Sequence, residues 1–377
     1  MKKIRVELGL RSYDVCVGAG LLGSADMLGK LASEIGASQV VVISDSNVAP
    51  LYGQATVDAL AAAGLDAWAT KPFPAGEPSK TLATASTLLD ELLTHSPAID
   101  RGTLVVPLGG GVAGDLGGFV AAIALRGLRV LQCPTSLLAC VDSSVGGKTG
   151  VDHQTGKNLI GAFHQPSCVV IDVETLRTLP LAELRNGLGE CVKHAVIRDE
   201  SLLEFIEASA EKLLATEGRG DDKKLSFDAE IMAELIARNV TIKAAVVSAD
   251  EREAGVRGHL NFGHTIGHAV ETFIGYDNIR HGEAVSLGMV AANHIAKARG
   301  LLGPSQAQRI TNILSKLELP TTTRPLDPGS IWQIMQHDKK ALAGKVRMVL
   351  PTEIGKVDIY DDITPAEVAQ AVEAIGK

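Results

Sequence analysis

The chain has 377 residues, of which 46% are apolar and 3% aromatic, and a formal net charge of −8. Its length and apolar content suffice for a buried core and favour two domains over one. The acidic balance argues against a general polyanion partner, and the scarcity of aromatic rings argues against base stacking, so we expect no nucleic-acid partner.

The five cysteines are odd in number and no pair has CxxC spacing, which predicts free thiols in a reducing, cytoplasmic compartment. The apolar stretches are too short to span a bilayer, and the first eight residues alternate charged and apolar side chains as a strand does. We therefore expect neither a membrane span nor a signal segment.

The first half of the chain alternates short β-branched runs with segments of helical period. Continuous apolar runs predict buried strands at residues 39–45, 104–108, 128–133 and 168–172. Such strands, separated by helices, are typical of a parallel sheet covered on both faces. Pro107 has no N–H to donate, so we expect it where a ladder hydrogen bond is absent.

After residue 179 helical period dominates, at residues 181–197, 201–215 and 229–249, with an exposed loop expected at 217–224. The sequence thus predicts an α/β domain over residues 1–179 and a mainly α-helical domain over residues 180–377. Ligands are expected between such domains.

A glycine-rich turn follows the second apolar run, in the order Gly109-Gly110-Gly111-Val112-Ala113-Gly114-Asp115. Glycine lets the backbone approach a pyrophosphate, and the N-terminus of the following helix offers free N–H groups. A purely structural turn remains an alternative. The usual acidic residue about 20 residues later is missing. Asp45, after an earlier strand, could accept hydrogen bonds from ribose hydroxyls instead.

A P-loop interpretation of Gly146-Gly147-Lys148-Thr149 fails because Asp142 stands where that motif needs glycine. Lys148 could still bind a phosphate as a point charge.

Histidines and carboxylates with metal-ligand spacing occur in the second half. His264 and His268 are one helical turn apart, His281 follows, and Glu190 and Lys193 lie within one turn of each other upstream. Two imidazoles, a carboxylate and an open position make a catalytic zinc site. Spacing favours the pair His264 and His268 and leaves the carboxylate open. Any one histidine is more often a surface or core residue.

Taken in order, many segments resemble the dehydroquinate synthase family over nearly the whole chain. They are residues 74–80, 109–119, 125–127, 135–150, 156–161, the segment around Glu190, 260–271, 281–289 and 338–340. The resemblance implies a Rossmann-like N-terminal domain, a helical C-terminal domain with a cleft between them, a homodimer, NAD, and zinc or cobalt. It also implies that Glu190, His264 and His281 bind the metal, against the spacing argument for His268, which would then contact substrate or support the ligands.

The resemblance further implies NAD and substrate contacts. For NAD they are Asp45, Glu77, Lys80, Gly109, Gly110, Gly111, Val112, Gly114, Asp115, Thr135, Ser136, Asp142, Lys148, Lys157 and Thr178. For substrate and catalysis they are Arg126, Asp142, Lys148, Asn158, Lys193, Lys243, Arg257, Asn261, His268, Lys339 and Lys340, where one lysine of the last pair is expected to contact substrate.

The implied reaction converts 3-deoxy-D-arabino-heptulosonate 7-phosphate to 3-dehydroquinate and phosphate, in the shikimate pathway. Transient oxidation by NAD is followed by phosphate elimination, reduction and an intramolecular aldol closure. Three alternatives stay open: another sugar phosphate cyclase, a metal-dependent polyol dehydrogenase of related fold, and a non-catalytic NAD-binding module. Arg257 and Asn261 before the Gly263-His264 turn favour the dehydroquinate synthase reaction over these alternatives.

Overall fold

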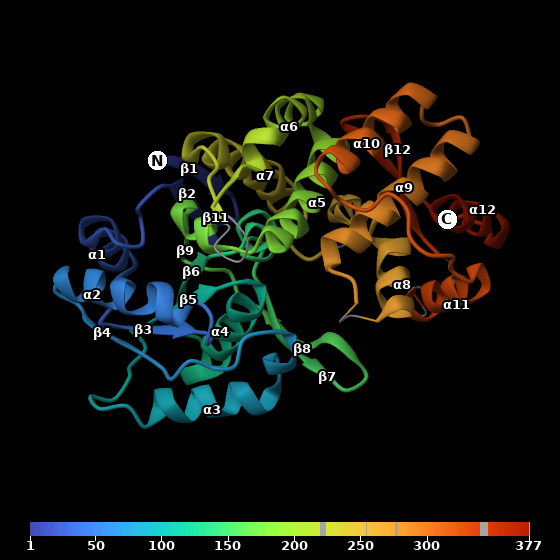
Figure 1. Ribbon diagram of the computed structural model, residues 1–377. Coiled ribbons are helices and arrows are strands. Elements are labelled where there is room, and N and C mark those ends of the chain that lie inside the picture. Colours follow the sequence, from blue (N-terminus) through green and yellow to red (C-terminus); the bar gives the residue numbers. More distant parts are fainter. Residues whose placement is uncertain (219–223, 254, 276–277, 340–345, 377) are drawn as a thin grey trace. The chain divides into compact units, whose positions relative to one another are not determined.

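The computed structural model describes residues 1–218, 224–253, 255–275, 278–339 and 346–376 (Figure 1). The chain forms two compact units. Unit 1 comprises Met1–Leu179 and Glu217–Ser248, and unit 2 comprises Pro180–Thr216 and Ala249–Lys377.

A seven-stranded sheet forms the centre of unit 1, in the order β1-β2-β9-β6-β5-β3-β4. Only β1 runs antiparallel to its neighbour, and the other neighbouring strands are parallel. The strands are β1 (Lys2–Val6), β2 (Tyr13–Gly18), β3 (Gln39–Ser44), β4 (Asp66–Ala69), β5 (Leu104–Gly109), β6 (Arg129–Pro134) and β9 (Cys168–Asp172). The predicted parallel sheet and its four buried strands are confirmed.

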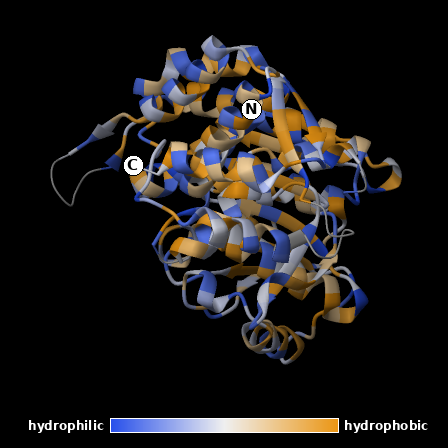
Figure 2. Cartoon of the chain, turned by 90° about the vertical axis from the view of Figure 1, so that its right-hand side faces the viewer, coloured by the Kyte–Doolittle hydropathy of each residue, from blue (hydrophilic) through white to orange (hydrophobic). Residues whose placement is uncertain are grey.

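Alternate side chains along β3 and β5 point to opposite faces of the sheet, and each face packs in its own hydrophobic core. Because both faces are buried, the sequences of these strands are continuously apolar. On one face Val40, Val42 and Leu104 pack with residues of α1 (Ala25–Ile35) and α2 (Gln54–Ala62). On the other face Val41 and Val105 pack with residues of α3 (Leu82–Leu93) and α4 (Gly111–Ile123). Colouring by hydropathy shows polar and apolar stretches on the same helices, as expected for helices with one buried face (Figure 2).

Pro107 lies in the central strand β5, where the register with β6 pairs Val105 with Val130 and Leu108 with Cys133 but has no pair for the two residues between. A ladder hydrogen bond is therefore absent beside Pro107, as predicted. Helix α4 approaches at this point through Gly117, where an added Cβ would lie 2.9 Å from the Pro107 ring.

A two-stranded antiparallel hairpin, β7 (Lys148–His153) with β8 (Gly156–Phe163), also belongs to unit 1. The sequence did not predict it, because β8 is largely exposed and its apolar residues do not alternate regularly with polar ones. The hairpin packs against α4, where an added Cβ on Gly118 would lie 2.6 Å from Thr149.

Unit 2 is mainly helical. Its helices are α5 (Leu181–Arg198), α6 (Glu200–Leu213), α8 (His264–Ile274), α9 (His281–Ala298), α10 (Pro304–Lys316), α11 (Pro328–Lys339) and α12 (Pro365–Ile375). It also contains an antiparallel pair, β12 (Met348–Glu353) and β13 (Lys356–Tyr360), which sequence patterning did not indicate.

The observed units differ from the predicted division at residue 179 in one segment. Glu217–Ser248 lies after residue 179 but packs with unit 1. Most of it is α7 (Ala229–Ala249), which is held to the first strand and the residues after it: Lys2 pairs with Glu234 at 2.6 Å, and the Glu7 N–H donates to the Ser248 hydroxyl at 2.9 Å. Of the expected loop, residues 219–223 lie outside the described residues, and the two-residue strands β10 (Thr216–Glu217) and β11 (Lys224–Leu225) flank them.

Within the described ranges, no helix combines the length and the apolar character that a bilayer span requires.

Candidate active site

Three helices of unit 2 bring an acid and three histidines together. Glu190 lies on α5, His264 and His268 lie one turn apart on α8, and His281 is the first residue of α9. One ligand atom from each of the three histidines lies within 4.8 Å of the others. Their ring centroids are 5.2 to 5.7 Å apart. The structure thus brings together all four candidate metal ligands that spacing or family resemblance predicted.

Glu190 Oε1 lies 3.4 Å from His264 Nε2 and 3.7 Å from His281 Nε2. Its other oxygen forms an ion pair with Lys193, one turn further along α5. Glu190 and Lys193 are buried, and no described residue donates a hydrogen bond to Glu190 Oε1. A buried carboxylate oxygen aimed at two imidazole nitrogens, with no hydrogen-bond donor, fits a divalent cation bound by all three.

The charges at this centre suit a metal site as well. Burial opposes ionisation of Glu190, but Lys193 and the two imidazoles outweigh it and hold its pKa well below the usual range. Burial holds the pKa of His264 well below its usual value, which keeps that imidazole in the neutral form that binds metals. Burial also lowers the pKa of His281, but the carboxylates of Glu190 and Glu271 raise it to about 9, so a metal bound at its Nε2 would take the place of a proton there.

Glycines allow the three helices to approach backbone to backbone. An added Cβ on Gly282 would lie 2.0 Å from the Asn186 carbonyl oxygen of α5, and one on Gly288 would lie 1.8 Å from the Gly263 carbonyl oxygen. The Gly282 N–H also donates to the Asn186 side chain at 2.6 Å. These contacts fix the first turn of α9, and with it His281, against α5.

Two residues near the centre were not singled out from the sequence. Glu271 is one further turn along the α8 face that carries His264 and His268, and its Oε2 lies 3.6 Å from His281 Nδ1. Asn186 holds the start of α9. The seven-residue interval from His264 to Glu271 places both on one helical face, a signal that the sequence did contain.

In unit 1 the candidate NAD residues follow the carboxyl ends of neighbouring parallel strands. Asp45 follows β3, the glycine turn begins at the end of β5, and Thr135 and Ser136 follow β6. Thr178 ends the helical turn Val173–Thr178 that follows β9, and its hydroxyl lies 2.8 Å from the Tyr52 hydroxyl. In open α/β sheets this edge is where ligands bind.

The N-terminus of α4 has the properties of an anion cradle. No side chain caps it, so its first N–H groups are not engaged by a capping residue. An added Cβ on Gly109 would lie 2.6 Å from the Ala113 Cβ and 3.1 Å from an Asp45 oxygen, while Gly110 and Gly111 approach the Ser136 and Ser143 hydroxyls. A side chain would fill this space, so the turn fits a dinucleotide pyrophosphate.

A buried lysine organises the groups beside this turn. The ammonium of Lys80 lies 2.7 Å from Asp115 Oδ2 and donates to Asn158 Oδ1 at 2.5 Å. Glu77 lies 4.0 Å from Lys80 and 3.8 Å from Lys157. Lys80 therefore links α4 to the β7–β8 hairpin, and it brings four of the predicted NAD residues and Asn158 into one network.

The remaining predicted residues of unit 1 have definite positions. Arg126 lies in a left-handed turn after α4 (φ 67°), Lys148 is the first residue of β7, and Lys243 of α7 forms an ion pair with Asp142. A left-handed conformation is uncommon for a residue with a side chain and is a hint of function.

In unit 2, Arg257 is buried and Asn261 ends the same helical turn, Val256–Asn261. The Arg257 N–H donates to Asp250 Oδ2 at 3.0 Å, and its guanidinium donates to the Glu251 carbonyl. Lys339 ends α11, and Lys340 lies outside the described residues.

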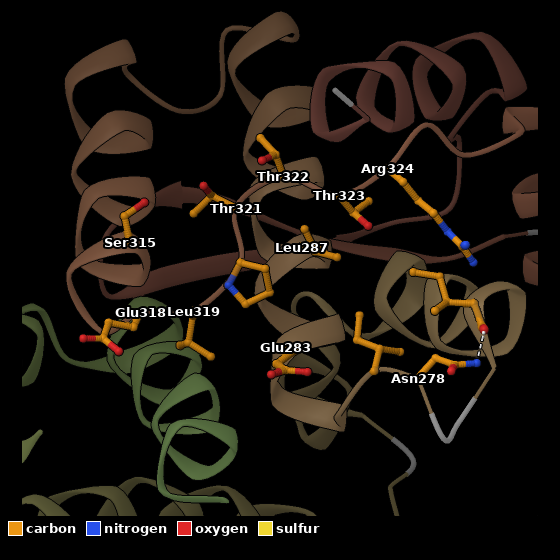
Figure 3. Close-up of a pocket in the computed structure, with 13 residues that line it drawn as sticks. Asn278, Glu283, Leu287, Ser315, Glu318, Leu319, Thr321, Thr322, Thr323 and Arg324 are labelled. Atoms are coloured by element: carbon orange, nitrogen blue, oxygen red, sulfur yellow. Dashed lines mark hydrogen bonds between the residues drawn. The ribbon is translucent and has the colours of Figure 1, made fainter. Parts of the chain in front are cut away.

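A cavity of about 950 Å³ lies elsewhere in unit 2 (Figure 3). Its lining includes Glu283, Ser315, Glu318, Thr321 and Arg324, and none of the metal-centre side chains. The candidate active site is therefore the centre around Glu190, where potential metal ligands converge, and not this cavity.

Comparisons with known proteins agree with this architecture. Residues 70–186 match the 3-dehydroquinate synthase N-terminal domain family, and residues 187–341 match the 3-dehydroquinate synthase C-terminal domain family. A 3-dehydroquinate synthase from Symbiobacterium thermophilum is 45% identical over 374 residues, which cover 98% of this chain and 99% of the relative.

Solved structures of two sugar phosphate cyclases are similar over full length. A 2-epi-5-epi-valiolone synthase from Streptomyces hygroscopicus, with NAD+ and Zn2+ bound, has a TM-score of 0.85 at 27% identity, covering 98% of this chain and 97% of that one. A 2-deoxy-scyllo-inosose synthase, complexed with carbaglucose-6-phosphate, NAD+ and Co2+, has a TM-score of 0.85 at 25% identity, covering 98% and 99%.

The fold and these likenesses define a sugar phosphate cyclase. Within that class, the family matches and the identity over nearly the full length decide the assignment: the chain belongs to the 3-dehydroquinate synthase family. It is an enzyme, a lyase of the shikimate pathway.

Proposed function

We propose that this chain converts 3-deoxy-D-arabino-heptulosonate 7-phosphate to 3-dehydroquinate and phosphate, with NAD oxidised and restored within each turnover. The observation that carries the proposal is the convergence of Glu190 Oε1 on the Nε2 atoms of His264 and His281, in a chain of this family.

Glu190, His264 and His281 are the proposed ligands of a divalent metal, zinc or cobalt. His264 and His281 both direct Nε2 at the Glu190 oxygen, while their Nδ1 atoms face the Phe262 carbonyl at 3.1 Å and Glu271 at 3.6 Å. This arrangement is typical of metal-binding imidazoles, and it favours His281 over His268 as the third ligand. When bound, the metal would supply Lewis-acid polarisation of substrate oxygens.

The α4 turn is the proposed NAD site, and NAD would supply a reversible hydride acceptor. The uncapped α4 N-terminus would hold the pyrophosphate, with the carboxylate of Asp45 available to a ribose. The wider proposed set is Glu77, Lys80, Gly109, Gly110, Gly111, Val112, Gly114, Asp115, Thr135, Ser136, Asp142, Lys148, Lys157 and Thr178.

Cationic and amide side chains are the proposed substrate ligands. Lysine and arginine suit the two anionic ends of the substrate, its phosphate and its carboxylate. The proposed set is Arg126, Asp142, Lys148, Asn158, Lys193, Lys243, Arg257, Asn261, His268 and one of Lys339 and Lys340. With basic groups dominating this set, the substrate's own phosphate is the proposed base for its elimination.

We assign NAD binding to unit 1 and metal binding to unit 2. We keep residues 1–179 and 180–377 as the proposed functional domains. The compact units differ from these domains because Glu217–Ser248, which contains Lys243, belongs to unit 1. We also propose a homodimer, and a reducing, cytoplasmic location that suits five free, buried thiols.

Comparison of substrates tests the proposal. Metal-loaded protein with NAD is given the heptulosonate phosphate, a sedoheptulose phosphate or a simple polyol, and phosphate, carbocycle and NADH are followed. Phosphate and 3-dehydroquinate in equal amounts from the first substrate are expected. Turnover of the sedoheptulose phosphate alone would make the chain a sister cyclase, and net NADH from the polyol would make it a dehydrogenase. No turnover of any of them would favour a binding protein.

A further inference from the structure

His281 lies between two carboxylates that approach opposite nitrogens of its ring. Its Nε2 is 3.7 Å from Glu190 Oε1, and its Nδ1 is 3.6 Å from Glu271 Oε2. Glu271 is 6% exposed. An acid this buried carries a large desolvation cost unless a charged or hydrogen-bonding partner offsets it, and the His281 ring is such a partner.

His264 has the same arrangement with a different outer group. Its Nε2 is 3.4 Å from Glu190 Oε1, and its Nδ1 faces the Phe262 carbonyl at 3.1 Å. In both rings an outer acceptor beside Nδ1 would favour a proton on that nitrogen, and Nε2 would then be the atom available to a metal.

We propose that Glu271 is a positioning residue that holds the His281 ring and its tautomer for the metal by accepting a hydrogen bond from the Nδ1–H group. The inference rests on the proposed function, because it assumes that His281 binds the metal. It adds Glu271 to the three proposed metal ligands, as a residue that acts through His281 and does not touch the substrate.

The local fold explains why a side chain is needed at this place. The backbone of His281 is fixed by the Gly282 N–H bond to Asn186, but that bond leaves the imidazole free to rotate about its own side-chain torsions. His264 receives its outer acceptor from the backbone two residues before it. His281, at the start of α9, receives its acceptor from α8, through Glu271.

Cobalt binding to purified apo-protein tests the proposal. Competition with a chelator gives the affinity, and the visible absorption of bound Co2+ gives the ligand geometry. Loss of such an outer partner lowers metal affinity by about 10–100-fold, so we expect a fall of this size and an altered cobalt spectrum for Glu271→Ala. Glu271→Gln keeps an acceptor oxygen but loses the negative charge, so we expect its cobalt affinity and spectrum to lie between those of Glu271→Ala and those of the wild type.

Glu207→Gln is the matched control, because it removes a carboxylate of the same unit that pairs with Arg309. We expect it to leave cobalt binding unchanged. Wild-type affinity and spectrum in Glu271→Ala would overturn the inference. If that variant does not fold, Glu271→Gln decides: a wild-type affinity and spectrum overturn the inference, and a weaker affinity with a shifted spectrum supports it.

His281→Ala separates this inference from the function on which it rests. If His281→Ala loses cobalt and Glu271→Ala does not, only the role of Glu271 is wrong. If His281→Ala binds cobalt like the wild type, the proposed ligand set itself is wrong.

Discussion

Gly282→Ala is the most informative change to the metal centre, because it moves a proposed ligand without altering any. The added Cβ would lie 2.0 Å from the Asn186 carbonyl oxygen, whereas ordinary contact begins at 3.4 Å. The start of α9 must therefore retreat from α5 by about 1.4 Å, the difference between these two distances. Metal–ligand distances tolerate about 0.2 Å, so His281 would leave the reach of a metal held by Glu190.

Two opposing effects set the stability change. Alanine is the better helix former by about 1 kcal/mol, whereas overpacking against backbone costs about 1–3 kcal/mol. Because the clash here is with backbone, the upper end applies, and we expect a net loss of about 2 kcal/mol in unfolding free energy. The affinity for Zn2+ should fall by more than the ~10–100-fold effect of losing an outer partner.

Gly329→Ala is the control, since Gly329 is likewise the second residue of its helix but an added Cβ would meet only an Asp327 oxygen at 3.5 Å. We expect this variant to be as stable as the wild type or more so, with unchanged Zn2+ affinity. Chemical unfolding and chelator competition measure both quantities. Wild-type stability and Zn2+ binding in Gly282→Ala would refute the helix-contact argument.

Three further outcomes are expected. His281→Ala should lose stoichiometric Zn2+ binding in equilibrium dialysis, and retained binding would exclude His281 as a ligand and point to the pair His264 and His268 instead. Gly109→Ala should weaken NAD binding in calorimetry while Gly23→Ala, whose added Cβ meets nothing within 4 Å, should not; equal affinities would remove the α4 turn from the NAD site. The side-chain hydrogen bonds from Arg299 lower the pKa of Glu367 to about 2. That contribution is present above the ordinary value of 4.5 and lost as pH falls toward about 2, so the unfolding free energy should drop more steeply across this range in the wild type than in Glu367→Gln; parallel curves would contradict this.

Much of unit 1 could be predicted from the sequence because each strand of a buried parallel sheet has a recognisable local pattern. Strands buried on both faces read as unbroken apolar runs, and Pro107 could be assigned to a gap in the ladder from its chemistry alone. The β7–β8 hairpin was not predicted, because the exposed strand β8 does not alternate polar and apolar residues, although its second half is apolar. The membership of α7 in unit 1 was also missed, since helical period does not say against which sheet or helix a segment packs.

The metal centre shows the same limit. Helical spacing could pair His264 with His268, because both lie on α8, but Glu190 and His281 arrive through packing of α5 and α9. That packing depends on glycine contacts such as Gly282 against Asn186, which no pattern within one helix encodes. Resemblance to a family supplied this tertiary information before the structure did.

The number of 3-dehydroquinate molecules formed per NAD shows whether NAD is restored within each turnover. Metal-loaded protein holding less than one equivalent of NAD is mixed with excess heptulosonate phosphate, and product, phosphate and NADH are measured in the same sample. We expect many molecules of product per NAD, phosphate equal to product, and no lasting NADH. Formation of NADH in step with substrate loss, with no carbocycle, would contradict it.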